Sequence, residues 1–222
     1  MARWLFRTWN WVRRFPYRKG YGVHSPTDFF FITSVIYEQK AYYAYQTLKG
    51  RQYDEKRKSL YREKVNKLLL RVVNHRQPKH IVDIGLTPDL HTAYLHAGKK
   101  TAPLYGFYEY AHIASFSIAE EQGLQMFPYN SFHKFMTETS AMECIHISHP
   151  MYYASIVEQC LSCATSQTCI IIAYPYANKE KKKWWKQVLE DERVRVSYDL
   201  YDIGILCCDH KRIKKHYKVN FF

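Results

Sequence analysis

The stretch His80-Ile-Val-Asp-Ile-Gly-Leu-Thr-Pro-Asp-Leu-His-Thr-Ala-Tyr-Leu-His-Ala97 decides the fold. Its apolar run Ile81–Ile84 predicts a strand, and Gly85 predicts a tight turn after it. Thr87-Pro88-Asp89 is a helix start signal, with a capping hydroxyl, proline at the first helical position and an acid in the first turn. Apolar residues then follow at the spacing of one helix face: Leu90, Ala93, Tyr94 and Ala97. The stretch therefore predicts a strand, a glycine turn and a helix.

In open α/β sheets such a unit brings a helix N-terminus and free backbone N–H groups to the carboxyl end of a strand, where ligands bind. The alternative is a plain connection between strand and helix, and a single glycine does not decide between the two.

The rest of the chain alternates between strand and helix patterns, which predicts a parallel sheet covered on both faces. Strands are expected at 81–84, 104–108, 124–127, 143–147, 168–173, 194–200 and 203–208, and helices at 25–38, 54–74, 111–122, 131–139, 151–164 and 178–190. The run Thr168–Ala173 is typical of a buried central strand. We therefore predict one doubly wound α/β domain over residues 54–222, preceded by a basic, aromatic helical extension over residues 1–53.

Composition indicates a globular chain, because 47% of the 222 residues are hydrophobic and 17% are aromatic. Lys and Arg number 33 against 20 Asp and Glu, a net charge of +13. This balance suits a polyanion, an anionic cofactor or an acidic membrane surface. Nucleic acid is left open but not favoured, since diffuse positive charge is common in proteins that bind none.

The six cysteines are expected to be reduced, as in a cytoplasmic protein. Cys160 and Cys163 have the spacing of a zinc or redox pair, but no second pair stands at zinc-site distance. No apolar run approaches ~18 residues, so no membrane-spanning segment is predicted. The first residues also lack the apolar core of a secretory signal.

Residues 3–15, R-W-L-F-R-T-W-N-W-V-R-R-F, predict a short basic helix. Its apolar residues line one side, and its arginines are spread around the rest: Trp4, Leu5, Trp9, Val12 and Phe15 against Arg3, Arg7, Arg13 and Arg14. Such a segment lies on an anionic bilayer or docks on the protein's own body. We expect docking on the body ahead of peripheral membrane contact.

Candidate site residues are those that follow the carboxyl ends of strands. They are Gly85, Leu86 and Thr87 after the first strand, Tyr108 and Glu109 after the second, Ser148, His149 and Tyr152 after the fourth, and Tyr174, Pro175 and Tyr176 after the fifth. A carboxylate at Glu109 can accept hydrogen bonds from ribose hydroxyls, and the aromatic rings can enclose an adenine. No nucleophile triad and no P-loop lysine stands out.

These features resemble the class I S-adenosylmethionine-dependent methyltransferases, and in particular a bacterial branch with a G-V/I-H-S-P motif upstream of the domain. The resemblance rests on Gly22-Val-His-Ser-Pro26, on Val82-Asp-Ile-Gly85 with Thr92, and on the section Trp185–Ile205. It implies a seven-stranded sheet whose last strand is antiparallel. It also implies S-adenosylmethionine as cofactor, bound by Asp83, Gly85, Leu86, Thr87, Tyr108, Glu109 and Ser148.

The chain departs from this family's pattern at positions that matter for the cofactor and for metal. Asp89 stands where the family has its second loop glycine, and its carboxylate would oppose the carboxylate of the cofactor. The alternative is that Asp89 is only a good first-turn residue. Tyr108 holds the slot of the second-strand acid unless Glu109 fills that role. Ser148 and Ala173-Tyr174 replace the acids that hold a divalent metal in catechol-type relatives, so no metal site is expected.

The sequence features lead to two candidate functions. The first is a cytoplasmic methyltransferase that transfers a methyl group to oxygen or nitrogen of an unidentified small-molecule acceptor, without a metal. Methyl transfer depends mainly on positioning the two reactants, and His24, His149 or Tyr152 is the candidate to take a proton from the acceptor. The second is a catalytically decayed fold that serves as a basic binding or scaffold protein for an anionic membrane surface or RNA.

Overall fold

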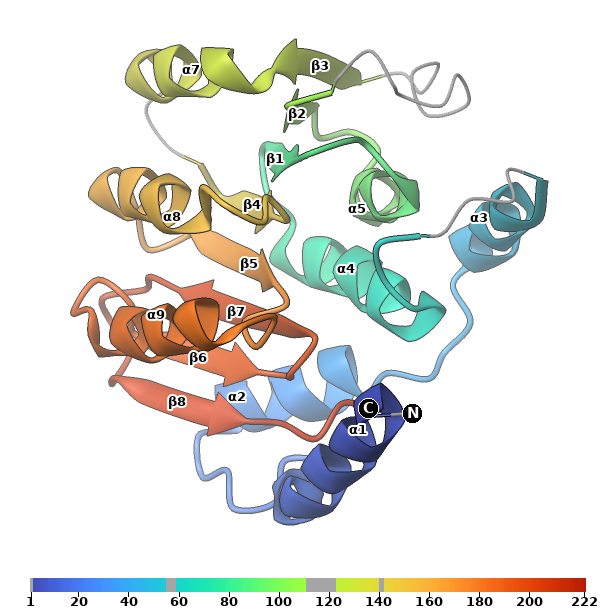
Figure 1. The fold of residues 1–222 in the computed structure, drawn as a ribbon, viewed down its shortest axis with the longest axis vertical. Helices are drawn as coiled ribbons and strands as arrows, with labels where there is room; N and C mark the ends of the chain where they lie inside the picture. The colour runs from blue at the N-terminus through green and yellow to red at the C-terminus, as the bar shows by residue number, and fades with distance from the viewer. Residues whose placement is uncertain (1, 55–58, 111–122, 140–141) are drawn as a thin grey trace.

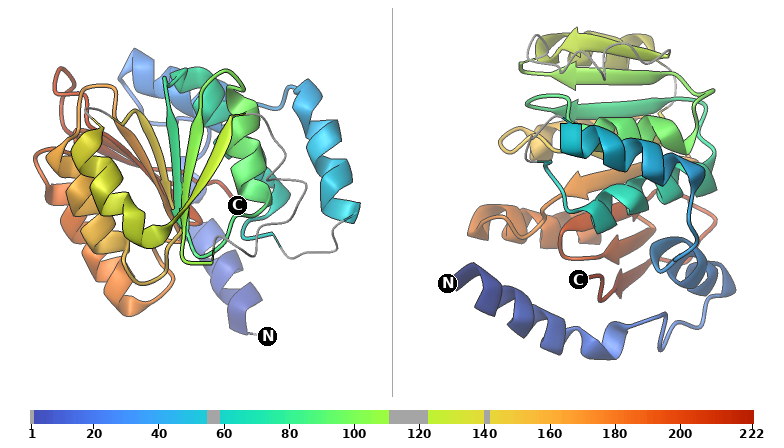
Figure 2. Two further views of the ribbon diagram at one scale, coloured as in Figure 1. Left: turned by 90° about the horizontal axis from the view of Figure 1, so that it is seen from above. Right: turned by 90° about the vertical axis from the view of Figure 1, so that its right-hand side faces the viewer.

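The structure is a computed structural model that describes residues 2–54, 59–110, 123–139 and 142–222 (Figure 1). It has three layers, with one twisted sheet between two sets of helices (Figure 2). The helix expected at 111–122 lies outside the described residues.

The central sheet has eight strands in the order β3-β2-β1-β4-β5-β7-β6-β8. Their bounds are β1 Ile81–Gly85, β2 Leu104–Tyr108, β3 Leu124–Pro128, β4 Cys144–Ile147, β5 Cys169–Ala173, β6 Val196–Asp199, β7 Ile203–Cys207 and β8 Lys215–Lys218. Strands β1 to β5 are parallel, and β7 is antiparallel to both β5 and β6. The predicted doubly wound, mostly parallel fold is confirmed.

The sheet extends one strand beyond the predicted seven. β8 forms in the segment expected to be a basic tail, and it pairs in parallel with β6. The two ends of β8 are charged and exposed, and this edge strand therefore carries little of the apolar pattern that marks a strand in the sequence.

Helices cover the two faces of the sheet in two groups (Figure 2). Helices α2 (Pro26–Phe31), α4 (Glu63–Arg76) and α5 (Leu90–Gly98) lie on one side, and α7 (Phe132–Glu138), α8 (Tyr153–Ser162) and α9 (Lys179–Glu190) lie on the other. Outside α4 and α5 lies α3 (Tyr43–Asp54), and α1 (Ala2–Arg13) flanks the β8 edge. The remaining short helical turns are η1 (Phe15–Tyr17), η2 (Ile32–Ile36) and η4 (Tyr129–Ser131).

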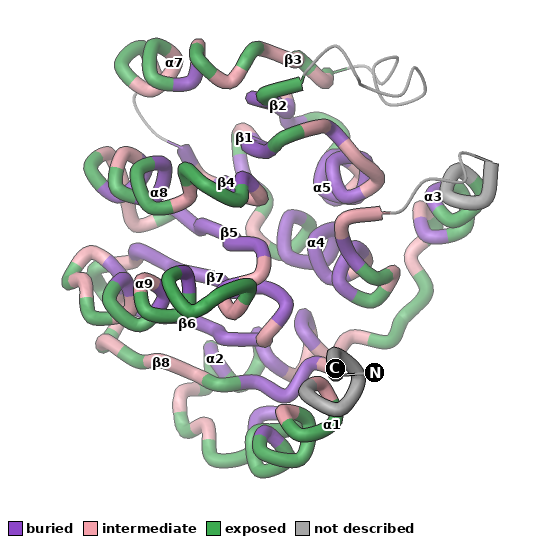
Figure 3. The backbone as a smooth tube through the Cα atoms, viewed as in Figure 1, coloured by how far each residue is buried: buried purple, intermediate pink, exposed green. Residues whose placement is uncertain are grey.

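The core sits between the helical layers and the central strands, which are buried along their lengths (Figure 3). All five residues of β5 are buried, as its β-branched run predicts. Helix α4 presents Val65, Leu68, Leu69 and Val72 to the sheet, as the amphipathic pattern predicts. The helix expected at 54–74 is α4, which begins later, at Glu63, and α3 (Tyr43–Asp54) forms in a segment where no helix was expected.

The start of α5 differs from the predicted one by two residues. Asp89, rather than Thr87, is the N-cap, and its backbone is extended there. Its side chain and that of Thr92 form a reciprocal capping box, in which the Asp89 carboxylate accepts from the helix backbone and the Asp89 N–H donates to the Thr92 hydroxyl. The carboxylate therefore lies against the helix N-terminus that borders the predicted ligand site.

Candidate functional site

A hollow of about 240 Å³ opens at the carboxyl ends of β1 and β4. It is lined by Leu60, Leu86, Thr87, Pro88, Asp89, His91 and Ser148. Three of the predicted binding residues, Leu86, Thr87 and Ser148, are therefore brought together. Leu60 and Asp89 add a wall and a charge that were not assigned to the site from the sequence.

Gly85 ends β1 next to the hollow, and the side chain of Ser148 packs closely against it. A β-carbon at this position would overlap the hydroxyl of Ser148. That hydroxyl donates to the carbonyl of Ile84 at 3.2 Å, and the Ser148 N–H donates to the same carbonyl at 2.8 Å. The loop after β4 therefore packs closely against the end of β1, because Gly85 has no side chain and the side chain of Ser148 is small.

We expect Gly85→Ala to lower the free energy of unfolding by about 1–3 kcal/mol, since overpacking a close contact costs this much. In a Ser148→Ala background the cost should be largely removed, because the overlapping hydroxyl is absent. Urea denaturation of the single and double variants measures both values. Gly50→Ala is the matched control, because Gly50 lies in α3 with open space around it. A Gly85→Ala cost that is the same in both backgrounds would contradict this packing.

Asp89 is the charged group of the hollow, and protein donors already surround it. Its carboxylate accepts from the backbone N–H of Leu60 and of Leu90. One of its oxygens lies 3.7 Å from Nδ1 of His91. Burial raises the pKa of Asp89, but these hydrogen bonds and His91 outweigh burial and lower the pKa below its ordinary value. A negative charge therefore stays at the α5 N-terminus at neutral pH.

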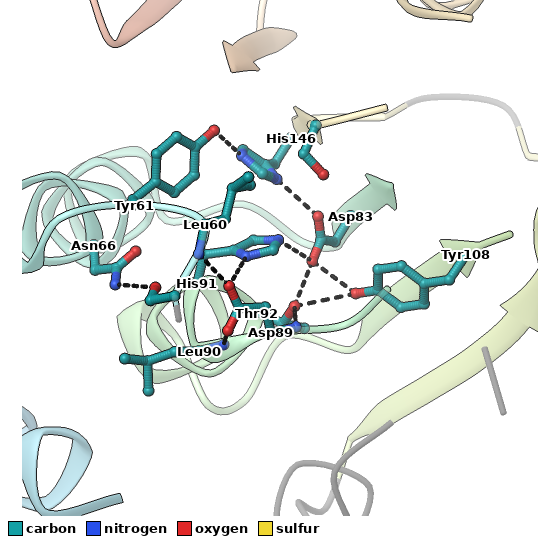
Figure 4. A network of polar contacts seen from close by, with 12 residues as sticks. Leu60, Tyr61, Asn66, Asp83, Asp89, Leu90, His91, Thr92, Tyr108 and His146 are labelled. Carbon is teal, nitrogen blue, oxygen red and sulfur yellow. Dashed lines mark hydrogen bonds and ion pairs between the residues drawn. The ribbon is translucent and has the colours of Figure 1, made fainter. Parts of the chain in front are cut away.

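Asp83 is completely buried, and Figure 4 shows the polar side chains that contact its carboxylate. One oxygen accepts from Nδ1 of His146 at 2.7 Å. The other accepts from the hydroxyls of Thr92 and Tyr108, each at 2.7 Å, and lies 3.3 Å from Nε2 of His91. Four protein groups thus surround this carboxylate, and it does not reach the hollow. Asp83, which the resemblance assigns to the cofactor, is thus placed under the site, where it joins β1 to β2, β4 and α5.

Tyr108, a candidate for the ribose, belongs to the same buried network as Asp83. It is completely buried, its hydroxyl donates to Asp83, and its ring fills the space beside Gly106. The next residue, Glu109, is exposed at the same strand end. Of the two candidates for the second-strand acceptor, Glu109 is the one that a ligand can reach.

The protonation of the network follows from its hydrogen bonds (Figure 4). Nδ1 of His146 carries the proton that is donated to Asp83, so Nε2 of a neutral imidazole is an acceptor. The Tyr61 hydroxyl, 2.8 Å away, donates to this Nε2. Burial lowers the pKa of His146, and this side chain is neutral. Burial also lowers the pKa of His91, but Asp83 and Asp89 raise it more, to about 9. A buried imidazolium therefore lies between two carboxylates.

A second cluster joins the ends of β2 and β4. Nε2 of His149 donates to Glu109 at 3.1 Å, and its Nδ1 accepts from the backbone N–H groups of Met151 and Tyr152. The imidazole also stacks with the rings of Tyr152 and Tyr129, at centroid distances of 4.7 and 5.1 Å. Burial lowers the pKa of His149, which keeps it neutral. Both of its nitrogens have partners, so it orients the Glu109 carboxylate.

His24, a candidate for contact with the acceptor, lies away from both clusters. It precedes α2, where Ser25 caps the helix and Asp28 bonds to Arg212, Tyr198 and Tyr217. Arg212 comes just before β8, which runs in the direction of β6 and therefore of the parallel strands. This places His24 near the amino ends of the strands, at the opposite edge of the sheet from the hollow.

Metal-ligand side chains come together in one group among the described residues. Asp83, His91 and His146 place one ligand atom each within 4.8 Å of one another. This is the hydrogen-bonded network beneath the hollow, in which four protein groups surround Asp83. The described parts of the chain contain no helix with both the length and the hydropathy that crossing a bilayer requires.

Sequence reasoning missed the two network histidines. The sequence did carry a signal for His146, because this polar residue interrupts the apolar strand Cys144–Ile147. In the sheet it lies beside Asp83 of the neighbouring strand. Polar side chains inside two central strands must bond to each other or to a helix above them. His91 follows the cap at the start of α5 and carries no such mark, because its burial depends on Leu60 and Tyr61 from another segment.

No protein-family model and no curated protein matches the chain. Solved structures do match its fold. One is the methyltransferase PaMTH1 of Podospora anserina bound to SAH, with a TM-score of 0.53 and 13% identity over 77% of this chain and 86% of the other. Another is an O-methyltransferase of Bacillus cereus in complex with SAH, with a TM-score of 0.56 and 12% identity over 76% and 92%.

A third is the O-methyltransferase TomG of Streptomyces achromogenes in complex with SAM, with a TM-score of 0.54 and 10% identity over 76% of this chain and 91% of the other. These similarities cover most of the chain, and at such low sequence identity they show a shared fold. The chain therefore has the fold of these methyltransferases.

Proposed function

We propose that this protein is an S-adenosylmethionine-dependent methyltransferase that binds its cofactor at the hollow between β1 and β4. The observation that carries the proposal is the place of the hollow: it lies at the carboxyl ends of β1 and β4, beside a glycine turn and a helix N-terminus, in the class I fold. The SAH and SAM complexes of proteins with this fold support the choice of ligand.

The residues of the site fit the nucleoside half of this cofactor. Glu109 offers an exposed carboxylate at the end of β2 for ribose hydroxyls, and His149 orients it. Leu86 and Ser148 supply an apolar wall and a small hydroxyl group next to it.

In this proposal the amino-acid half of the cofactor lies next to the Asp89 carboxylate. The Asp89 carboxylate already accepts from the backbone N–H groups of Leu60 and Leu90, which an incoming carboxylate would otherwise use. It attracts an ammonium or sulfonium group and repels a carboxylate. Asp89 therefore tunes affinity for the cofactor, and it is the residue at which the site departs most from an open anion-binding helix end.

The bound cofactor supplies an electrophilic methyl group, and the protein's part is to hold the acceptor in line with it. The acceptor is an oxygen or nitrogen of a small molecule. Tyr152, whose side chain is exposed beside His149, is the candidate for contact with the acceptor's proton. His149 positions Glu109. No metal step is part of the proposal, because Ser148 and Ala173-Tyr174 stand where catechol-type relatives carry metal-binding acids.

Calorimetry with S-adenosylhomocysteine tests the proposal. We expect a one-to-one binding heat with the wild-type protein, and a weaker affinity for Glu109→Gln. Glu180→Gln, which removes an exposed acid from α9, is the control and should bind as the wild type does. Absence of heat at millimolar ligand, with the protein shown to be folded by circular dichroism, would remove the proposal.

Asp89→Asn should raise the affinity for S-adenosylhomocysteine about fivefold, since like charges at ~4 Å in water repel by about 1 kcal/mol. Asn is as good an N-cap as Asp, so the start of α5 should be kept, which a glycine would not ensure as well. The same titration measures the change. Unchanged affinity would mean that Asp89 does not face the ligand, and reduced affinity would mean that its carboxylate pairs with the ligand's ammonium.

A catalytically decayed fold that serves as a binding protein is the second candidate, and two observations favour it. The hollow, at about 240 Å³, is smaller than most ligand pockets, which begin near ~300 Å³. Asp83 is enclosed by four protein groups beneath it. A folded protein that gives no heat with S-adenosylhomocysteine, in the wild type and in Asp89→Asn alike, would select this candidate.

A further inference from the structure

The N-terminal helix α1 docks on the body through its polar face. Arg7 donates two hydrogen bonds to the Asp202 carboxylate, at 3.0 and 2.9 Å. Arg14 is buried and bonds to the Asp199 carboxylate at 2.9 Å. Asn10 donates to the Tyr201 hydroxyl. These three residues are at positions i, i+3 and i+7 of one helix face, so charged and amide groups attach α1 to the end of β6 and the loop after it.

Among the α1 residues whose side chains are described, 7–13, the apolar ones are exposed to solvent. Trp9 is 61% exposed, and Val12, one turn further on, is also exposed. Trp11 and Phe15 are exposed as well and touch edge to face at 5.5 Å. A surface helix ordinarily buries its apolar face and shows its charges to water. In α1 this arrangement is reversed, because the carboxylates of Asp199 and Asp202 hold its cations inward.

The exposed apolar surface continues beyond the helix. Phe15, Tyr21 and Phe29 line a hollow of about 570 Å³ together with Pro16, Arg18 and Lys19. Tyr21 is 80% exposed, and Phe29 is exposed at the start of α2. We call Trp9, Trp11, Val12, Phe15, Tyr21 and Phe29 the aromatic surface. Contiguous apolar side chains of this size on the outside of a protein mark a binding surface.

The charged residues of the segment 7–24 are all basic. No acidic residue precedes Asp28 in the sequence. The cations Arg13, Arg18 and Lys19 are exposed among the apolar side chains, and the Arg18 guanidinium lies 3.6 Å from the centre of the Phe15 ring. Indole and phenyl rings next to cations are the groups that favour the interface of an anionic bilayer, with rings at the acyl boundary and cations at the headgroups.

We propose that the aromatic surface docks this protein on the face of an anionic lipid bilayer. A second copy of the chain would bring like charges together across the contact, which opposes association. Single-stranded RNA would stack on the rings, but Val12 at the centre of the α1 face offers no ring for a base. The surface is separate from the hollow between β1 and β4, and the proposal does not depend on the activity of that site.

Vesicle flotation of the full chain tests the proposal. With vesicles of phosphatidylcholine and phosphatidylglycerol at 7:3, we expect flotation at low salt, much less at high salt, and little with phosphatidylcholine alone. The combined variant Trp9→Ser, Val12→Ser, Phe15→Ser should lower the partition coefficient at least tenfold. The combined variant Arg13→Gln, Arg18→Gln, Lys19→Gln should lower it about 100-fold, from the attraction of an anionic surface for three cations.

The control removes equally exposed apolar side chains elsewhere: Tyr43→Ser, Met151→Ser and Ile213→Ser, which are 93%, 72% and 87% exposed. It should float as the wild type does, and thermal unfolding should show all variants folded. Failure of the wild type to float, equal flotation on phosphatidylcholine alone, or equal loss in the control would overturn the proposal. Binding of a fluorescent polyuridine that is lost in the same variants, without flotation, would overturn it in favour of RNA.

Discussion

Asp83→Asn should lower the free energy of unfolding by about 3–5 kcal/mol, the cost of removing one partner from a buried ion pair. Asp83 is completely buried and accepts from His146, Thr92 and Tyr108 while facing the His91 imidazolium at 3.3 Å. The NH₂ group of an asparagine at this position would face hydrogen-bond donors that now bond to a carboxylate oxygen, and it cannot accept from them. It also leaves His91 with Asp89 alone, at 3.7 Å.

Urea denaturation measures this loss, and Glu180→Gln is the matched control. Glu180 carries the same charge on the exposed side of α9, so its neutralisation should change the free energy of unfolding by no more than about 0.5 kcal/mol. A loss below about 1 kcal/mol for Asp83→Asn would mean that the network does not hold the sheet and α5 together.

The wild-type protein should lose about 3 kcal/mol of stability between pH 6.5 and pH 9.5 through His91 alone. Asp83 and Asp89 outweigh burial and raise the pKa of His91 from 6.5 to about 9. A group whose pKa is raised in the folded state stabilises the fold fully below its unfolded pKa, and this contribution is lost as the pH rises through the folded pKa. A difference of about 2.5 units at ~1.36 kcal/mol per unit gives the magnitude.

The comparison with His91→Gln isolates this contribution, because other groups titrate in the same range. Burial lowers the pKa of Lys181 to about 8, which adds a slope of the opposite sign in both proteins. Denaturation of both proteins at pH 6.5 and 9.5 should therefore show a larger loss of stability in the wild type, by about 3 kcal/mol. Equal losses would show that His91 is neutral in the folded protein.

The fold was predictable because its signals are local. The apolar run before Gly85, the β-branched run of β5 and the amphipathic pattern of α4 each follow from a few neighbouring residues. The cap of α5 was predicted two residues early, because Thr87 and Asp89 both have capping side chains; it is Asp89 that forms the capping box with Thr92 and also accepts from Leu60. β8 is an edge strand with charged residues, and such strands carry little pattern.

The candidate site was predictable in its position and less so in its composition. The rule that ligand sites follow strand ends brings Leu86, Thr87 and Ser148 to one hollow, and Glu109 to the neighbouring strand end. It also selected Tyr108, and the resemblance selected Asp83; both point inward and bond to each other. The rule predicts which strand ends border a ligand site, but it does not predict whether a side chain there points into the site or into the core. His24 was chosen from a motif, and the packing of α2 at the other edge of the sheet was not visible in that motif.

Crystals soaked with S-adenosylhomocysteine would show whether the hollow between β1 and β4 is the cofactor site. We expect electron density for the ligand in the hollow bounded by Leu86, Asp89 and Ser148, with the Glu109 carboxylate at the ribose hydroxyls. Well-ordered crystals without ligand density there, at millimolar ligand and with the hollow open to solvent, would mean that the cofactor does not bind at this strand end.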